Sequence, residues 1–252
     1  MFIFFDAERP SDSAFVERVW RCHSEGGGPF LSVASSHWEL VVTRLKGDTY
    51  VTLRGPETKP REVFCPPEGE WVAIRFKAGA FMPQLPIARL IDGRDLTVPA
   101  SKRHFRLDGS TWEIPTFDNA ETFVSRLARA GILSRDPAVE AALEGDSHAL
   151  SLRSAQRHFL QATGMSHAML RQIERARHAT NLLRSGVSIG DTVHEAGFFD
   201  QAHLTRSLKQ LIGLTPARIV RDERQLSFLY KTGDSRRVQD QPPTTRGGSH
   251  AS

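Results

Sequence analysis

The chain has 252 residues, of which 39% are hydrophobic and 25% are charged, and its formal net charge is +4. This composition is typical of a folded, soluble protein rather than a disordered or fibrous one, and the length allows two modest domains. No apolar run approaches the roughly 20 residues of a membrane-spanning helix, and the first residues lack the basic lead of a secretory signal. We therefore expect a cytoplasmic protein with no membrane partner.

Charge is distributed unevenly along the chain. Residues 1–115 carry 15 basic and 15 acidic side chains, whereas residues 151–221 carry ten arginine and lysine side chains against four acidic ones. A basic segment joined to a neutral one is typical of a nucleic-acid-binding domain attached to a second domain. A solvated basic face would give the same count, so charge alone does not decide between the two.

The first 115 residues are predicted to form a mainly β domain. Residues 38–45 and 49–53 alternate apolar and polar side chains around a Gly-Asp pair, which predicts a hairpin, and residues 71–76 resume the alternation. Prolines are frequent between positions 56 and 99 and disfavour a long helix there. An early helix is expected only over residues 12–22.

Helical periodicity replaces this pattern after residue 116. A connecting helix is expected from Asn119 to Ala130, where Gly131 ends it. Asp136 followed by proline is expected to open the next helix, because it combines an N-cap side chain with proline at the first helical position.

Residues 151 onward resemble residues 200 onward, at an offset of 49 positions. Ser151 corresponds to Asp200, both N-cap types, and the glycine that follows each predicted helix also corresponds. In each copy an apolar stripe lies opposite a polar face. The polar faces carry the predicted DNA-binding residues, namely Arg153, Gln156 and Arg157 in the first copy and Gln201, Ala202, Thr205, Arg206 and Lys209 in the second.

Exposed arginine and glutamine on a short helix suit recognition of base edges, because arginine bonds guanine and glutamine bonds adenine in a bidentate manner. Upstream of the second copy, residues 188–191 resemble a capping box and Gly197 ends a short helix, so this region reads as helix, tight turn and capped helix. Between the copies, apolar spacings predict a helix over residues 167–185, about 27 Å long. Such a rod could place two recognition helices about one DNA turn apart.

The segment from Gly197 to Arg206, followed by Gly213-Leu214-Thr215-Pro216, resembles the signature of AraC/XylS-type transcriptional regulators. The resemblance covers about residues 136–221. It implies a seven-helix DNA-binding domain in which the second helix of each of two helix-turn-helix motifs enters the major groove of promoter DNA. The predicted DNA-binding residues of both copies match the family's recognition helices by position.

The sequence departs from the family pattern at Leu208, where phenylalanine is usual, and at Ile219, where tyrosine is usual. Both are core positions. The first motif has a looser turn over residues 145–150, without a glycine next to Ser151. The N-terminal half resembles a poorly characterised domain that is fused to some regulators of this kind, and this resemblance implies no ligand.

Two other functions are compatible with the N-terminal domain. A cupin-like enzyme could draw a metal site from His23, His37, His104 and Glu70, but no histidine pair there has ligand spacing, and Cys22 and Cys65 have the pattern of ordinary reduced thiols. A small-molecule sensor with vestigial DNA binding could instead line a pocket with Trp38, Trp71 and Trp112, although aromatic residues on strands are more often core. We expect no catalytic residue, metal or cofactor.

The sequence thus predicts an α+β protein in which a mainly β domain precedes an all-α domain with two helix-turn-helix motifs joined by a long helix. The predicted segments are a sensing or dimerisation domain (1–115), a linker helix (116–135), an AraC-type DNA-binding domain (136–224) and a disordered tail (232–252). The expected partner is double-stranded promoter DNA. RNA polymerase, a small-molecule effector and a second copy of the chain are further candidates.

Overall fold

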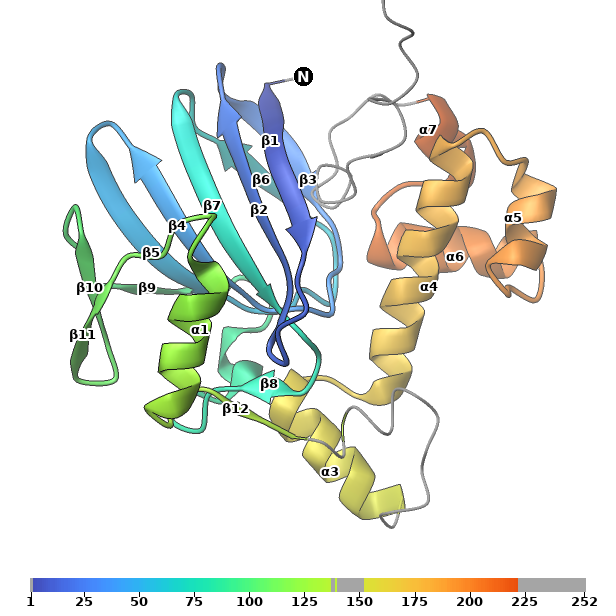
Figure 1. Cartoon of the computed structure of the whole chain (residues 1–252). Helices are drawn as coiled ribbons and strands as arrows, with labels where there is room; N and C mark the ends of the chain where they lie inside the picture. Colours follow the sequence, from blue (N-terminus) through green and yellow to red (C-terminus); the bar gives the residue numbers. More distant parts are fainter. Residues whose placement is uncertain (1, 137–138, 140–151, 222–252) are drawn as a thin grey trace, which may run out of the picture.

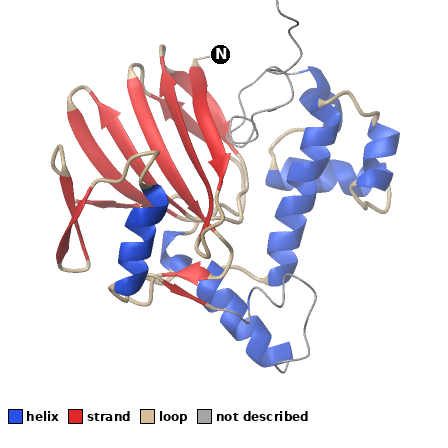
Figure 2. Cartoon of the chain, in the orientation of Figure 1, coloured by secondary structure: helices blue, strands red, loops and turns tan. Residues whose placement is uncertain are grey.

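A computed structural model describes residues 2–136, 139 and 152–221. The strands lie on one side of the molecule and helices α4 to α7 on the other, with α3 at the base next to β8 (Figure 1). Helix α1 lies against the strands (Figure 1 and Figure 2). The strands are β1 (Ile3–Pro10), β2 (Val16–Ser24), β3 (Gly28–Ser32), β4 (Glu39–Leu45), β5 (Asp48–Arg54), β6 (Arg61–Cys65), β7 (Gly69–Phe76), β8 (Ala80–Phe81), β9 (Leu96–Val98), β10 (His104–Leu107), β11 (Ser110–Glu113) and β12 (Ser134–Arg135).

Six of these strands form one antiparallel sheet in the order β1-β2-β7-β4-β5-β9, and β3 pairs with β6 in a separate hairpin. The hairpin predicted from residues 38–53 is confirmed as β4 and β5. Its turn is formed by Lys46 and Gly47, whose φ angles are 52° and 86°, and Asp48 already belongs to β5. Two successive positive φ angles match the twist of a tight hairpin, which explains the glycine.

The early helix predicted over residues 12–22 is wrong, because this segment forms most of β2, an inner strand between β1 and β7. A bulge between Val16 and Arg18 interrupts the alternation of side chains. Val16, Val19 and Trp20 consequently are buried at spacings of three and four, the spacing of a helix. The local pattern was therefore helical although the pairing on both sides is that of a sheet.

The sheet is covered on both faces. Leu40 and Val42 of β4 belong to one core, with Phe123 and Val124 of α1 (Ala120–Arg129), whereas Val41 belongs to a smaller core with residues of the β3–β6 hairpin. This alternation follows from the two-residue period of a strand. The expected helix after Asn119 is confirmed, and it packs on the sheet.

The helical region is built on α3 (Leu152–Thr163), α4 (His167–Arg184), α5 (Ile189–Glu195), α6 (Gln201–Leu211) and α7 (Pro216–Arg221). The long helix predicted over residues 167–185 is confirmed as α4. The expected helix start at Pro137, the turn at residues 145–150 and the tail at 232–252 lie outside the described residues.

The helical region packs directly on the β domain. Val33 and Ala34 belong to the helical core, and the amide of Ala34 donates a hydrogen bond of 2.9 Å to the carbonyl of Leu211 at the end of α6. The turn after α3 also lies close to η1 (Ile87–Leu90), where a Cβ on Gly164 would lie 3.0 Å from the amide nitrogen of Ala88. The ends of α3 and α6 are thus both held against the same domain.

Candidate nucleic-acid interface

Helices α5 and α6 form a tight helix-turn-helix unit. The hydroxyl of Ser188 accepts a hydrogen bond of 3.1 Å from the amide of Asp191, and the carboxylate of Asp200 accepts one of 2.6 Å from the amide of His203. Each cap satisfies an amide that has no partner inside its helix. Gly197 has a φ of 68°, which lets the chain reverse between the two helices.

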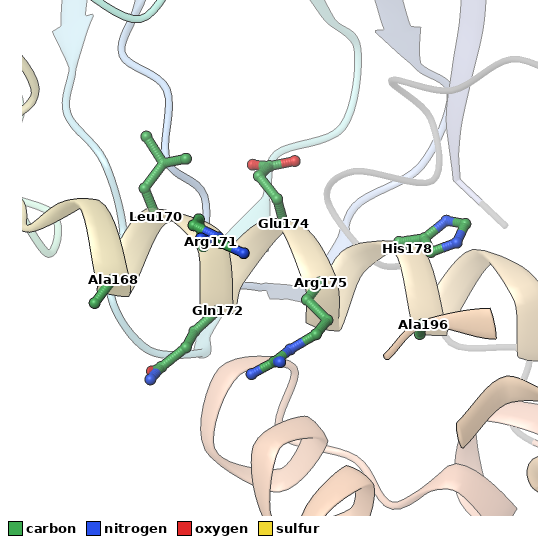
Figure 3. Close-up of a pocket in the computed structure, with 8 residues that line it drawn as sticks. All are labelled: Ala168, Leu170, Arg171, Gln172, Glu174, Arg175, His178 and Ala196. Carbon is green, nitrogen blue, oxygen red and sulfur yellow. The ribbon is translucent and has the colours of Figure 1, made fainter. Parts of the chain in front are cut away.

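Arg175 of α4 holds this turn in place. Its guanidinium lies 4.8 Å from the centre of the Phe198 ring, and it donates a hydrogen bond of 3.3 Å to the carbonyl of Gly197. Figure 3 shows Arg175 and Gln172 projecting from one side of α4 while Glu174 projects from the other. One side of α4 therefore supports the helix-turn-helix unit, and the other faces away from it.

The predicted readout residues of the second copy lie on the solvent side of α6. Leu204, Leu208 and Leu211 are buried at spacings of four and three and attach the helix to the core. The exposed positions are Gln201, Ala202, Arg206 and Lys209, and Thr205 is half-buried between the two faces.

In the first copy, Gln156 and Arg157 are exposed on α3 and Phe159 is buried. Arg153 lies on α3, but its side chain is outside the described residues. Neither Arg157 nor Arg206 has an ion-pair partner among the residues that the structure describes. Their charges are thus available to an external anion, although their contact with DNA stays a prediction.

Sequence reasoning missed a second surface with basic side chains, on α4. A depression of about 580 Å³ lies along the helix, and its lining includes Arg171, Arg175 and His178 together with one acidic residue, Glu174 (Figure 3). These residues stand at positions i, i+4 and i+7, which places them on one helix face. That spacing is visible in the sequence, so it could have identified the surface.

The opposite side of α4 carries a charged junction with the β domain. The hydroxyl of Ser36 donates a hydrogen bond of 2.5 Å to the carboxylate of Glu174, and Nη1 of Arg177 lies 3.4 Å from the hydroxyl of Ser35. Arg177 is only 7% exposed. Burial lowers its pKa, against the opposing effect of the Glu174 charge 3.9 Å away.

The network continues inside the β domain. Nε2 of His37 lies 2.8 Å from a carboxylate oxygen of Glu17, and Arg75, 2% exposed, donates a hydrogen bond of 3.0 Å to Glu39. Burial opposes ionisation of Glu17, but the hydrogen bond to His37 and the charges of His37 and Arg75 outweigh it and lower the pKa of Glu17 to about 2. Glu17 is therefore a carboxylate at neutral pH.

The residues considered for a metalloenzyme are not brought together. His23 pairs with Asp6 at 2.7 Å, His37 belongs to the domain junction, and His104 and Glu70 lie on different strands. The described part of the chain contains no cluster of three or more metal-binding side chains. Within the same residues, no helix combines the length and apolar character needed to cross a membrane.

The sequence matches with known proteins lie in this helical region. Residues 146–222 match a family described as a helix-turn-helix domain. A stretch of 92 residues is 34% identical to the HTH-type transcriptional regulator RipA of Corynebacterium glutamicum, over 36% of this chain and 28% of that protein. The chain thus matches less than a third of the length of this relative.

Among solved structures, an apo form of ToxT from Vibrio cholerae is 10% identical with a TM-score of 0.39, over 84% of this chain and 98% of that one. Wild-type ToxT with a bound unsaturated fatty acid is 11% identical with a TM-score of 0.33, over 84% and 96%. Likeness of this degree supports no conclusion about the present fold or ligand.

The geometry of α5 and α6 and the family match together identify a helix-turn-helix domain within residues 146–222. This part of the chain resembles the corresponding part of AraC-type transcriptional regulators. The resemblance predicted from the Gly197–Arg206 segment is confirmed for this domain.

Proposed function

We propose that the chain binds specific sites in double-stranded promoter DNA through two helix-turn-helix units, with α3 and α6 as recognition helices. The observation that carries this proposal is the polar face of α6, where exposed Arg206 has no ion-pair partner among the described residues and Gln201 lies on the same solvent side. Arginine and glutamine at such positions read base edges in the major groove.

Helix α4 connects the two units. Its 18 residues span about 27 Å, α3 adjoins its N-terminal end, and α6 lies beside its middle part (Figure 1). Successive major grooves are about 34 Å apart on one face of a duplex. We assign Arg153, Gln156 and Arg157 to one groove and Gln201, Ala202, Thr205 and Arg206 to the next.

Phosphate binding is assigned to cations outside these readout positions. Lys209 is exposed one turn along α6 from Thr205, and Arg171 is exposed on α4 beside the depression. Such contacts supply affinity and orientation without sequence preference. In this reading the β domain senses an effector or forms a dimer in the cytoplasm, and RNA polymerase is a further partner at the promoter.

The test is selection of bound duplexes from a random DNA pool by the purified full chain at moderate salt. We expect one preferred sequence with two blocks of defined bases about one helical turn apart. Arg206→Ala should relax the bases of one block and Arg157→Ala those of the other. Arg103→Ala, an exposed arginine of the β domain, is the matched control and should leave the selected sequence unchanged.

No enrichment of any sequence would refute specific binding. Enrichment of a single block, with Arg157→Ala without effect, would retain the α6 unit and refute the use of α3.

A further inference from the structure

A pocket of about 300 Å³ lies between the β3–β6 hairpin and the sheet, on the face that α1 does not cover. Its walls are mainly aromatic, with Trp20 and Trp71 from the sheet and Phe30 from the hairpin. Of the three tryptophans considered for a pocket, only Trp71 lines this one, because Trp38 is stacked on Phe76 in the main core and Trp112 donates a hydrogen bond to Leu107 there.

Two guanidinium groups border the aromatic walls. Nε of Arg54 lies 3.7 Å from Asp95, which is an ion pair too long for a hydrogen bond, and Arg61 donates one hydrogen bond of 3.1 Å, from Nη2 to Glu57. Within the described residues, Asp95 and Glu57 are the polar partners of these two side chains. With Arg54, Arg61 and Asp95 as its charged groups, the lining has a net charge of +1.

Both the shape and the charge restrict the occupant. The volume is about twice the roughly 150 Å³ of an apolar cavity that holds benzene, and it is at the small end of the range for ligand sites. Flat aromatic walls favour a ligand with a flat apolar ring system. Guanidinium groups with unused N–H donors favour a carboxylate on that ligand. Phe64, which is 65% exposed at the mouth, adds apolar surface that the fold itself does not bury.

We propose that this pocket binds a small organic monoanion with a flat, one- or two-ring apolar body, whose acidic group lies between Arg54 and Arg61. The ligand would cover apolar surface of Trp20, Trp71 and Phe30. It would also engage N–H groups of the two guanidiniums that form no hydrogen bond within the described residues.

The wall formed by β3 also contacts the helix-turn-helix domain. Phe30 packs against the small core that borders the pocket, whereas the next residue, Leu31, packs on the helical core. Successive side chains of a strand point to opposite faces, which explains the difference. A Cβ on Gly213, in the turn after α6, would lie 3.3 Å from Cδ2 of Leu31. A few residues further along, Ala34 donates its hydrogen bond to Leu211.

Occupancy of the pocket therefore acts on α6 through β3. A ligand that displaces or fixes Phe30 changes the position of Leu31, and with it the support of the C-terminal end of the recognition helix. This effect of the ligand on α6 rests on the proposed DNA-binding function, whereas ligand binding itself does not.

Binding is tested by calorimetry on the full chain, with 2-naphthoate as the monoanion and 2-naphthamide as a neutral probe of nearly the same shape. We expect one bound naphthoate per chain, at least tenfold tighter than the amide. Arg54→Met and Arg61→Met should each remove most of this preference. Arg103→Met is the matched control and should keep the wild-type preference.

Equal affinities of the two probes, or equal naphthoate binding by the wild type and Arg54→Met, would overturn the proposal. Absence of naphthoate binding at millimolar concentration would do the same. Because Arg54 is half-buried and Arg61 exposed, both variants are expected to fold, and a melting curve for each variant verifies this.

The coupling is tested on the duplex obtained by selection, with and without saturating naphthoate. We expect at least a threefold change in DNA affinity, which Leu31→Ala abolishes while its naphthoate affinity stays within twofold of the wild type. An unchanged DNA affinity would overturn the coupling alone. If the ligand-free chain selects no duplex, the proposed function fails, and the coupling with it, while calorimetry still decides the binding site.

Discussion

Cations buried near the domain junction and cations on the exposed faces of α3 and α6 occupy opposite environments. Arg75 of β7 and Arg177 of α4 are 2% and 7% exposed, and each lies next to a carboxylate of the same charged network. Arg157 and Arg206 are exposed and have no such partners among the described residues. Arginine therefore serves two purposes in this chain. A buried guanidinium stabilises the structure, whereas an exposed guanidinium without an ion-pair partner is able to bind an external anion.

The difference also predicts where substitutions act. Removing one member of a buried ion pair leaves the other charge in a low-dielectric environment, which costs much more than the pair contributed. Removing an exposed cation leaves the fold intact and changes only what the surface binds. Four predictions test this contrast.

The largest effect is expected for Arg177→Ala. This change removes a buried side chain and opens a gap between α4 and the β domain, and it also removes the guanidinium 3.9 Å from Glu174, so the free energy of unfolding should fall by about 2 to 5 kcal/mol. Urea denaturation followed by tryptophan fluorescence measures the loss. Arg206→Ala should change the same quantity by less than about 0.5 kcal/mol. Equal losses in the two variants would contradict the contrast.

The second prediction concerns pH. The pKa of Glu17 is lowered from 4.5 to about 2 in the folded chain, so its contribution to stability is fully present above pH 4.5 and is lost as the pH falls towards 2. The expected loss is up to about 3 kcal/mol. Glu17→Gln should flatten the stability curve in that window.

Glu121 gives the matched control for this measurement, because the hydrogen bond from Arg9 lowers its pKa to about 2 as well, at a site between β1 and α1. Glu121→Gln should remove its own share of the pH dependence and leave that of Glu17. Curves for the wild type and Glu17→Gln that fall in parallel below pH 4.5 would show that Glu17 is not the group involved.

The two environments also differ in how far the sequence predicts them. Helix α4, the hairpin of β4 and β5, and the buried stripe of α6 follow from local periodicity, because each pattern repeats within a few residues. The solvent side of α6 follows from the same stripe. Local periodicity failed at β2, where the bulge after Val16 imitates helical spacing.

The junction could not be predicted, because its partners are far apart in the sequence. Ser36 and Glu174 are separated by 138 residues and Ser35 and Arg177 by 142, and neither pair belongs to a local motif. Before folding, Arg177 is one of ten basic residues in a cationic segment. Only the packing of two domains shows that it is structural.

The third prediction separates two kinds of exposed cation. Arg206→Ala should weaken binding to the selected duplex by about 1 to 3 kcal/mol and relax discrimination at one base position. Lys209→Ala should weaken binding to all sequences alike and make the salt dependence of the affinity shallower by about one unit of slope. Titrations on the selected and scrambled duplexes at several salt concentrations measure both. Uniform losses in both variants would mean that Arg206 contacts the backbone rather than a base.

The smallest effect is expected at the N-cap of α6, where stability and DNA binding can be separated in one residue. Asp200→Ala removes the side chain that accepts a hydrogen bond from the amide of His203, so the free energy of unfolding should fall by about 1 kcal/mol. Asp200→Asn retains an acceptor and should recover most of this loss while removing a negative charge at the start of α6. If DNA affinity falls with Asp200→Ala but not with Asp200→Asn, the ordering of α6 limits binding. If affinity instead rises with both, repulsion between Asp200 and phosphate outweighs the cap, and the exposed face acts through charge more than through a fixed helix.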